Sequence, residues 1–566
     1  MEPVLTRLGK FLGPIALWIA AAGLWCVSGH FWMGLDLTPD KRHTVHAYTR
    51  SLLQKAKSKE VVLTVYLEGD LPVELKRLQS FTKKWLQTLK RHAPGRVAYE
   101  FVNVAKLPAQ TQKKLIQTWI ACGLQPTVLH HAERAQPDKD SVVFPFIKLT
   151  YLNQERHILM LESEHTVSLP RMVEQSMGQL EYKVAAALHA AMHPDAKRIA
   201  LLRGHGEPDI RSLQGLTLAL QKIYVLDVID FCHKTNLQAY DALLITGPQK
   251  PFSEAEKYKL DQYIMQGGKT LFFLDGVRVD LQTLRTGRAL ARVVENNLSD
   301  ILFKYGVRIN ADLVQDACAG VYPVVTGRVG NQPQISLLRW PFFPVLRRFA
   351  KHPITKGLDA IAPKFISSID AINVEGIEQT PLVFSSEQAR VLSWPVCVDL
   401  KALHPSHLNT SFDKAQLPLA YLVEGKFTSA YRHRLLSSDN DQDPLIPISE
   451  PTKLFCMGTS AIVCNDWNGR TNRAMAWGYD PFLEEQFSNP AWVLNILAYM
   501  TQEVGLTALR ARASQNKQLH PLRAEKERLF WQLWNFSIPV LSLVLLRVSW
   551  YVRRKKRFAR SSQLKS

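Results

Sequence analysis

The stretch PFSEAEKYKLDQYIMQGGKTLFFLDG, residues 251–276, predicts a helix followed by a strand. Ser253 and Glu256 form a capping box, which predicts that a helix begins here. The helix is expected to stop at the glycine pair 267–268, because glycine readily adopts the left-handed backbone that ends helices. The apolar run 270–274 (TLFFL) then predicts a strand, so this stretch has the alternation of an α/β fold.

Strands and helices alternate on both sides of this unit. Further strands are predicted over 198–202, 225–231, 242–245 and 453–457, and further helices over 213–223 and 492–501. Such alternation favours a parallel sheet covered on both faces, so we expect a Rossmann-like (flavodoxin- or amidotransferase-like) domain over 196–505. The less periodic region near 280–440 indicates an insertion or a small β-rich lobe. Its segment 340–344 (WPFFP) is compatible with core packing or with an exposed contact patch.

A different order of elements precedes this domain. Strands are predicted over 61–67, 97–104, 144–151 and 157–161, and helices over 74–91 and 110–122. The order β-α-β-α-β-β predicts a thioredoxin-like domain over 34–195. Residues 68–72 (EGDLP) stand where a redox member carries CxxC, so this domain lacks the thiolate that disulfide exchange requires.

Two apolar segments predict membrane-spanning helices. Residues 11–33 are long enough to cross about 30 Å of hydrocarbon, and a cleaved signal peptide is the alternative. Residues 529–551 predict a second span, and the basic tail 552–566 predicts a cytoplasmic C-terminus. Two spans put both termini in the cytoplasm and the domains between them outside it. The predicted order is a cytoplasmic N-terminus (1–10), a span (11–33), the thioredoxin-like domain (34–195), the Rossmann-like domain (196–505), a juxtamembrane helix (506–528), a span (529–551) and the tail (552–566).

The charge and the cysteines exclude several classes of function. The formal net charge is +20, but outside the tail the excess is spread along the chain, which argues against a nucleic-acid partner. The seven cysteines form no CxxC pair and no Cys/His ligand spacing, so we predict no metal and no cofactor. A disulfide between Cys456 and Cys464 stays open at this point.

Four side chains are candidate contacts for a ligand or a partner: His205, Glu207, Asp241 and Asp275. Loops after parallel strands are where α/β folds bind ligands, and such loops hold His205, Glu207 and Asp275. We predict no catalytic residue, because no GxSxG or GxCxG elbow is present and no GK[ST] directly follows the glycines 204 and 206. A structural turn is the plainer interpretation of His205. The rival hypothesis, an extracytoplasmic hydrolase or carbohydrate-acting enzyme, requires at least two of the four to converge in one pocket.

An ordered set of stretches resembles the GldG family of gliding-motility-associated ABC transporter auxiliary proteins. They are LTPDKRHT (37–44), VYLEGDLPVELKRLQ (65–79), YEFVNV (99–104), GHGEPD (204–209), residues 251–276 quoted above, LSDILFKYGVRINADLVQD (298–316) and VEGKFTSAY (423–431). The resemblance implies a non-catalytic, substrate-binding-like subunit in a bacterial inner membrane, with its main domains in the periplasm. It also implies ABC permease and ATPase subunits as partners and a carbohydrate as a ligand. One departure is the turn 458–461 (GTSA), where the family's acidic turn, similar to SDGD, is expected.

Overall fold

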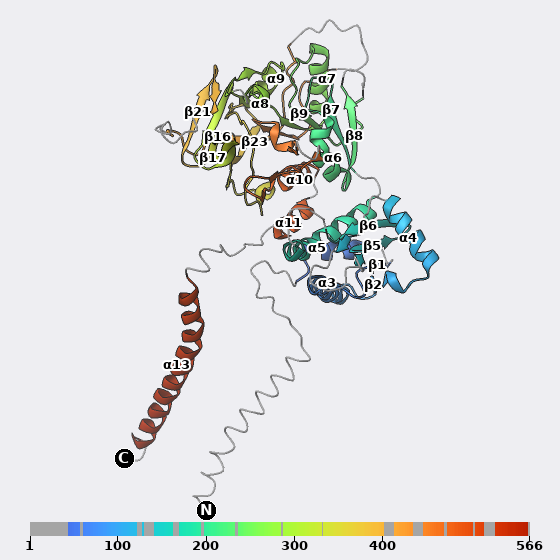
Figure 1. Cartoon of the computed structure of the whole chain (residues 1–566), viewed down its shortest axis with the longest axis vertical. Coiled ribbons are helices and arrows are strands. Elements are labelled where there is room, and N and C mark those ends of the chain that lie inside the picture. The colour runs from blue at the N-terminus through green and yellow to red at the C-terminus, as the bar shows by residue number, and fades with distance from the viewer. Residues whose placement is uncertain are drawn as a thin grey trace, which may run out of the picture. The chain divides into compact units, whose positions relative to one another are not determined.

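The computed structural model describes most of the chain (Figure 1). The described residues are 44–56, 60–121, 127–129, 141–161, 169–193, 197–231, 236–284, 287–330, 332–400, 412–433, 445–468, 473–501, 504–513 and 527–563. The chain divides into two compact units, Met1–Ser514 and Gln515–Ser566. The predicted first span, residues 11–33, lies outside the described residues.

The first part of unit one contains a four-stranded mixed sheet in the order β2-β1-β5-β6. β1 (Val61–Val65) pairs in parallel with β2 (Val97–Phe101) and antiparallel with β5 (Phe146–Tyr151), which pairs antiparallel with β6 (Gln154–Leu159). The helices here are α2 (Ala47–Lys55), α3 (Val73–His92), α4 (Ala109–Ala121) and α5 (Leu169–Met192). A short ladder joins β3 (Thr127–Leu129) to β4 (Ser141–Val143). The strands and helices predicted before residue 162 are present, with ends shifted by a few residues.

Helix α3 forms because its apolar residues recur at helical spacing. Leu75, Leu78, Trp85 and Leu89 are buried, and Phe81 packs at the edge of the same core. Burying one such side chain stabilises the fold by about 1.5–3 kcal/mol. Packing of this apolar stripe therefore holds the helix in place, while its opposite face is left to solvent.

The second sheet has eight strands in the order β18-β20-β23-β24-β10-β9-β7-β8. The parallel part consists of β8 (Val225–Asp230), β7 (Arg198–Arg203), β9 (Ala242–Thr246), β10 (Lys269–Phe273) and β24 (Thr452–Met457). The antiparallel part consists of β23 (Pro418–Gly425), β20 (Ile377–Phe384) and β18 (Arg348–Phe349). The prediction of a parallel sheet is therefore wrong for three of the eight strands, and the sheet is mixed.

The antiparallel strands come from the region whose sequence lacks a helical period. A parallel neighbour needs a long crossover connection, which is usually a helix. Among the described residues from 345 to 457, the chain forms a short 3-10 turn at Pro353–Thr355 but no α-helix. Strands in this region therefore return beside their neighbours in the opposite direction.

Helix α7 (Glu254–Met265) begins and ends as the sequence predicts. The backbone N–H of Glu256 donates to Ser253 Oγ at 3.4 Å, and the carboxylate of Glu256 accepts the Ser253 N–H at 2.8 Å. Gly267 follows with φ at +87°. The capping box therefore starts the helix and the glycine ends it.

Both faces of the eight-stranded sheet are covered. Alternate strand residues such as Leu201, Leu271 and Phe455 face α6 (Gln214–Gln221) and α10 (Asn489–Met500). Their neighbours on the strands face α7 and α9 (Ser299–Lys304). Cys456 belongs to the second face and Cys464 packs against the first, and both thiols are free. The disulfide left open above is therefore absent, because these side chains lie on opposite faces of the sheet.

The region near 280–440 also forms a β-rich lobe with its own small core. Its strands include β15 (Asp312–Asp316), β16 (Ala319–Val329), β17 (Gln332–Pro344) and β21 (Ala389–Ser393). Trp340 and Phe342 from the WPFFP segment are buried in this core, and the Trp340 ring lies 4.6 Å from that of Phe343. Core packing is therefore the correct interpretation of this segment.

Helix α11 (Val504–Ala513) joins the two parts of unit one. Leu506 and Leu509 are buried. The Arg510 guanidinium donates to Asn495 Oδ1 on α10 at 2.8 Å and also to the hydroxyl of Tyr182 on α5. These contacts attach α11 to α10 in the second part of unit one and to α5 in the first part. Of the juxtamembrane helix predicted over 506–528, residues 514–526 lie outside the described part of the chain.

The second unit contains α13 (Arg528–Gln563). Within the residues described, Arg528–Arg554 is the one helical segment long and apolar enough to cross a membrane. Pro539 lies inside it, and the Ser542 hydroxyl donates to the Pro539 carbonyl at 2.7 Å. Large apolar side chains along the segment are exposed within the chain, as lipid contact would require.

Candidate functional site at the carboxyl ends of the strands

Strand order places a topological switch point between β7 and β9. β8 lies on one side of β7 and β9 on the other, so the chain reverses its direction of progress across the sheet at this point. Ligands bind outside the carboxyl ends of strands at such points. The loops that follow β7, β9, β10 and β24 meet at this edge, and three of the four predicted residues lie in them.

His205 is packed into the fold. Its ring stacks on Phe252 with centroids 3.7 Å apart and planes 8° apart. Its Nε2 lies 3.2 Å from Glu256 Oε2, in the capping box of α7. Only 3% of His205 is exposed, so a ligand in solvent cannot reach it without displacing Phe252 or Glu256. These contacts favour the structural interpretation of His205.

Glu207 closes the same loop. One carboxylate oxygen, Oε2, accepts the backbone N–H groups of Gly204 and His205 at 3.0 and 2.9 Å. The other, Oε1, lies 3.8 Å from His205 Nδ1, and neither of these two buried atoms has a hydrogen-bond partner. Glu207 therefore holds the backbone of the Gly204–Pro208 turn in place.

Asp275 lies apart from this pair, at the end of β10. Its carboxylate accepts the backbone N–H of Ser460 at 2.6 Å and the Ser460 hydroxyl at 2.7 Å. Burial raises the pKa of the Asp275 carboxyl, while the hydrogen bonds from Ser460 act in the opposite direction. Asp275 thus joins the loop after β10 to the loop after β24, in which GTSA (458–461) replaces the expected acidic turn.

Asp241 lies at the other edge of the sheet, directly before β9. Its carboxylate accepts the ammonium of Lys197 and the backbone N–H of Arg198, both at 2.9 Å. Because β7 and β9 are parallel, this is the amino edge, the full length of a strand away from His205 and Asp275. The structure therefore does not bring Asp241 together with the other three residues.

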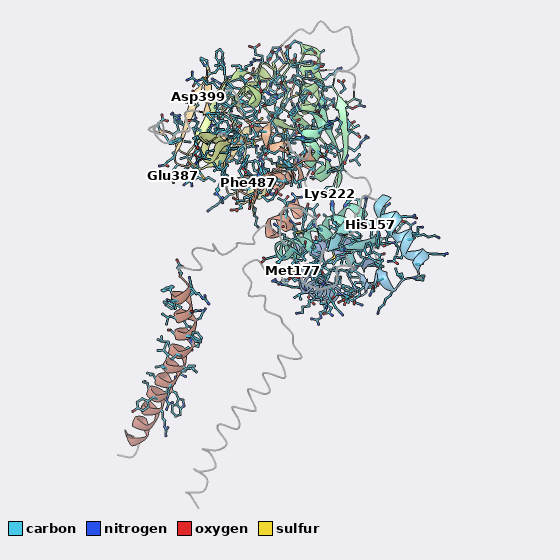
Figure 2. All side chains as sticks on the ribbon, in the orientation of Figure 1. His157, Met177, Lys222, Glu387, Asp399 and Phe487 are labelled. Carbon is cyan, nitrogen blue, oxygen red and sulfur yellow. The ribbon has the colours of Figure 1, made fainter. Side chains whose placement is uncertain are left out.

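A cleft of about 320 Å³ opens at the carboxyl edge, and Asp275 is the one predicted residue that lines it. Ser460 and Arg278 line it beside Asp275, and Lys364 forms an ion pair with Asp466 in its wall. Aromatic residues complete the lining: Phe365, Tyr479 and Phe487, the last of which is labelled in Figure 2. The cleft thus combines apolar and charged groups, as small-molecule sites do.

The described part of this cleft lacks the parts of a nucleophilic site. Its thiol, Cys464, is half-buried, and burial raises the pKa of that thiol to about 12. At neutral pH the group is therefore protonated and a poor nucleophile. Among the described residues, no group of three or more His, Cys, Asp or Glu side chains is placed to hold a metal ion.

The triplet Gly268-Lys269-Thr270 matches the end of a phosphate-binding loop in sequence only. In a phosphate loop the glycine-rich segment follows a strand and opens a helix. Here the triplet follows α7 and opens β10, and the Thr270 hydroxyl is buried. The order of elements is reversed, so these residues do not form a nucleotide site.

Sequence reasoning missed most of the cleft lining. Ser460 follows the predicted strand 453–457, so the rule that placed Asp275 at this edge could have placed Ser460 there too. Lys364 and Asp466 lie in loops far apart in sequence, and no local pattern marks their pairing. Only the folded chain brings them together.

Comparison with models of protein families shows to which family this chain belongs. A model of the ABC-type uncharacterized transport system family matches residues 196–496, more than half of the chain. The chain belongs to this family. Membership confirms the resemblance to GldG-like ABC transporter auxiliary proteins and supports an accessory role in an ABC-type transport system. A second model, for a domain of unknown function, matches residues 39–150.

Comparisons with curated proteins and with solved structures do not extend this family assignment. The search of curated proteins finds no match. Among solved structures, the N-terminal domain of mmIFT52 is 13% identical, with 54% of this chain and 97% of that chain covered and a TM-score of 0.31. A ThuA-like protein from Parabacteroides merdae is 11% identical, with 57% and 92% covered and a TM-score of 0.25. At these TM-scores neither similarity bears on fold or function.

Proposed function

We propose that this chain is a membrane-anchored, non-catalytic accessory subunit of an ABC-type export or gliding-motility complex in a bacterial inner membrane. The observation that carries the proposal is the family match over residues 196–496. The apolar helix Arg528–Arg554 supports an anchor at the C-terminal end, and the basic tail after it favours a cytoplasmic C-terminus. With the sequence-predicted span 11–33, the domains between the spans lie in the periplasm and both termini in the cytoplasm.

The two sheets suggest what the periplasmic domains are. The order β2-β1-β5-β6, with β1 and β2 parallel and the others antiparallel, supports a thioredoxin-like domain that lacks its redox cysteines. The parallel part of the second sheet, with its switch point, supports a Rossmann-like domain. In this proposal both domains bind partners or ligands and neither carries out chemistry.

Partners must supply the energy for transport. No phosphate loop is encoded in this chain, so an ABC permease and its ATPase are the partners that the proposal requires. Coupling to an ATPase across the membrane passes through membrane helices. Asn535 and Ser537 on α13 offer polar groups to a neighbouring helix, at about 0.6–2 kcal/mol for each hydrogen bond formed.

The cleft is the proposed ligand site, and a carbohydrate is the proposed ligand class. Aromatic side chains such as Tyr479 offer a stacking surface, and Arg278, Lys364 and Asp466 offer polar contacts for hydroxyl groups. A hydrolase would need two of the predicted residues to converge in this cleft, whereas Asp275 lines it alone among them. Ligand binding without turnover is therefore the function that we assign to the cleft.

Topology is tested with the chain's own cysteines. Cys318 and Cys397 are free and exposed, whereas Cys456 is buried. In intact spheroplasts, a membrane-impermeant maleimide should label Cys318 and Cys397, and a cysteine introduced by Ser562→Cys in the tail should react only after permeabilisation. Protection of Cys318 and Cys397 until permeabilisation would refute the proposed topology.

Partner contact through the anchor is tested by replacing α13 with an unrelated apolar helix of equal length. The replacement should keep the chain in the membrane but lower the recovery of the permease in a pull-down of the tagged chain from mild detergent. Undiminished recovery would show that α13 is only a tether.

A further inference from the structure

The exposed face of α3 carries basic side chains and no acidic ones among them. Six basic side chains on it are exposed: Lys76, Arg77, Lys83, Lys84, Lys90 and Arg91. They form three pairs at intervals of seven residues, which is about 10.5 Å along a helix. At 3.6 residues per turn, all six lie within an arc of roughly 140°, opposite the buried stripe. We call these six residues the basic face.

The basic face differs from an ordinary solvated helix surface, in which acidic and basic residues alternate at i and i+4 and support each other. Here Ser80 and Gln87 separate the pairs, so no two cations are three or four residues apart. The interval between pairs is close to the Debye length of roughly 8–10 Å in physiological salt, which limits their mutual repulsion. The pattern thus accumulates charge of one sign without the usual penalty within the helix.

The structure supplies little neutralisation of this charge. Among the ion pairs of the described residues, one reaches the basic face: Lys76 Nζ lies 4.0 Å from Asp70 Oδ1, and both side chains are largely exposed. Lys90 also lies over the ring of Tyr99, 5.8 Å from its centroid, which leaves its charge in place. The face therefore presents an extended positive surface about 21 Å long.

We propose that the basic face of α3 docks against the anionic phospholipid headgroups of the membrane in which the chain is anchored. This inference rests on the proposed anchoring. Ten residues, 34–43, separate the apolar segment 11–33 from the first described residue, Thr44, and ten extended residues reach at most about 36 Å. The tether keeps the domain within reach of the bilayer surface.

A planar anionic surface fits this face better than a protein partner does. Hot spots of protein interfaces are aromatic or large side chains seated in pockets. Beside the basic face, the exposed apolar side chain on α3 is Val73, which is small and 80% exposed. Evenly spaced cations without an apolar anchor are suited to headgroups, where each basic residue near the surface strengthens binding about fivefold.

The test uses the full chain reconstituted into vesicles, with a genetically encoded fluorophore in place of Gln87 and an energy acceptor on lipid headgroups. Vesicles contain phosphatidylcholine alone or with phosphatidylglycerol. We expect stronger energy transfer in the mixed vesicles, and its loss when salt rises from about 0.1 M to about 1 M and the Debye length shrinks from ~10 Å to ~3 Å.

The charge variant combines Lys83→Gln, Lys84→Gln, Lys90→Gln and Arg91→Gln. It should lower the ratio of docked to undocked chain by about fivefold for each residue that contacts the surface. The control makes the same change in charge at exposed sites of the other sheet's domain, with Lys304→Gln, Arg308→Gln, Lys351→Gln and Lys426→Gln, and should leave the ratio unchanged.

Equal energy transfer in both kinds of vesicle, or equal loss in the charge variant and the control, would overturn the inference. So would protection of the fluorophore from an aqueous quencher by added poly-glutamate but not by phosphatidylglycerol, which would point to an acidic protein partner. If the chain does not incorporate into neutral vesicles at all, the proposed anchoring fails and this inference falls with it.

Discussion

The bond between Asp275 and Ser460 should hold the floor of the cleft together, and Ser460→Ala tests this. The substitution removes the hydroxyl that donates to the Asp275 carboxylate at 2.7 Å but leaves the backbone N–H at 2.6 Å. Asp275 is half-buried at the wall of the cleft, and its carboxylate keeps the backbone N–H of Ser460 as a donor after the substitution. A hydrogen bond to a charged group contributes about 1.5–3 kcal/mol, which at a pH above the raised pKa of Asp275 is the expected loss.

Hydrogen exchange measured by mass spectrometry on the full chain gives the local free energy of opening. Such a local measurement is needed because the unfolding of a multidomain chain has no single free energy. Amides of β10 and β24 should exchange roughly 10- to 150-fold faster in Ser460→Ala, as 1.5–3 kcal/mol requires. Amides of β1 and β5 in the other sheet serve as the internal control and should not change.

Asp275→Asn provides the matched background. Its amide oxygen can still accept the Ser460 N–H, but the group carries no charge, so Ser460→Ala should cost only about 0.5–1.5 kcal/mol there. The two substitutions should therefore be coupled in a double-mutant cycle. A change of less than twofold in exchange after Ser460→Ala, or an equal cost in both backgrounds, would refute the assignment of Asp275 as the residue that joins these loops.

Four further outcomes follow from the same geometry. The pKa of the Asp275 carboxyl is raised above its ordinary 3.8, so the folded chain holds this proton more tightly than the unfolded chain does. The local free energy of opening at β10 should therefore fall as the pH rises from 3.8 through the raised pKa, and this pH dependence should be absent from Asp275→Asn. Gly247→Ala should destabilise the cleft by at least 1–3 kcal/mol by hydrogen exchange, because Gly247 has φ at +59° and an added Cβ would lie 2.6 Å from Ser460 Oγ. His205→Phe should retain the stacking on Phe252 and most stability, whereas His205→Ala should lose about 3 kcal/mol, as measured by exchange at β7; equal losses would contradict the packing role. Iodoacetamide at pH 8 should alkylate Cys318 much faster than Cys464, whose pKa of about 12 keeps it protonated, and equally rapid alkylation of Cys464 in the folded chain would contradict that raised pKa.

Local signals predicted the elements well. The capping box at Ser253 and Glu256, the glycine stop after α7 and the apolar stripe of α3 are each contained within a few turns of sequence, and each is present in the structure. The direction of strands in the second sheet was harder to predict. β20 and β23 join this sheet antiparallel, and the segments that connect them show no hydrophobic periodicity. Periodicity predicts that a strand forms, but not which strand it pairs with or in which direction.

The candidate site was predictable only in outline. The rule for carboxyl ends of strands placed His205, Glu207 and Asp275 at one edge, but it could not tell a buried structural side chain from a cleft lining. Stacking of His205 on Phe252 depends on tertiary packing across two loops. Asp241 precedes its strand, so the same rule, applied to strand direction, already assigns it to the opposite edge.

The spacing of the basic residues along α3 carries information that the net charge of the chain does not. Spread over the chain, the net charge of +20 gives no focused site. The interval of seven residues between the basic pairs of α3 becomes meaningful only once the helix is known to bury the opposite stripe. Helix formation thus places six of the chain's basic residues on one exposed side of α3.

Whether this chain is an accessory subunit of an ABC-type transport complex is tested by purifying the tagged full chain from its native membranes in mild detergent. The co-purified proteins are then quantified by mass spectrometry. We expect an ABC permease and its ATPase in fixed ratio to the chain, with ATP hydrolysis that depends on the ATPase and is absent from the chain alone. Recovery of the chain without any ABC subunit above the level of an unrelated tagged membrane protein would contradict it.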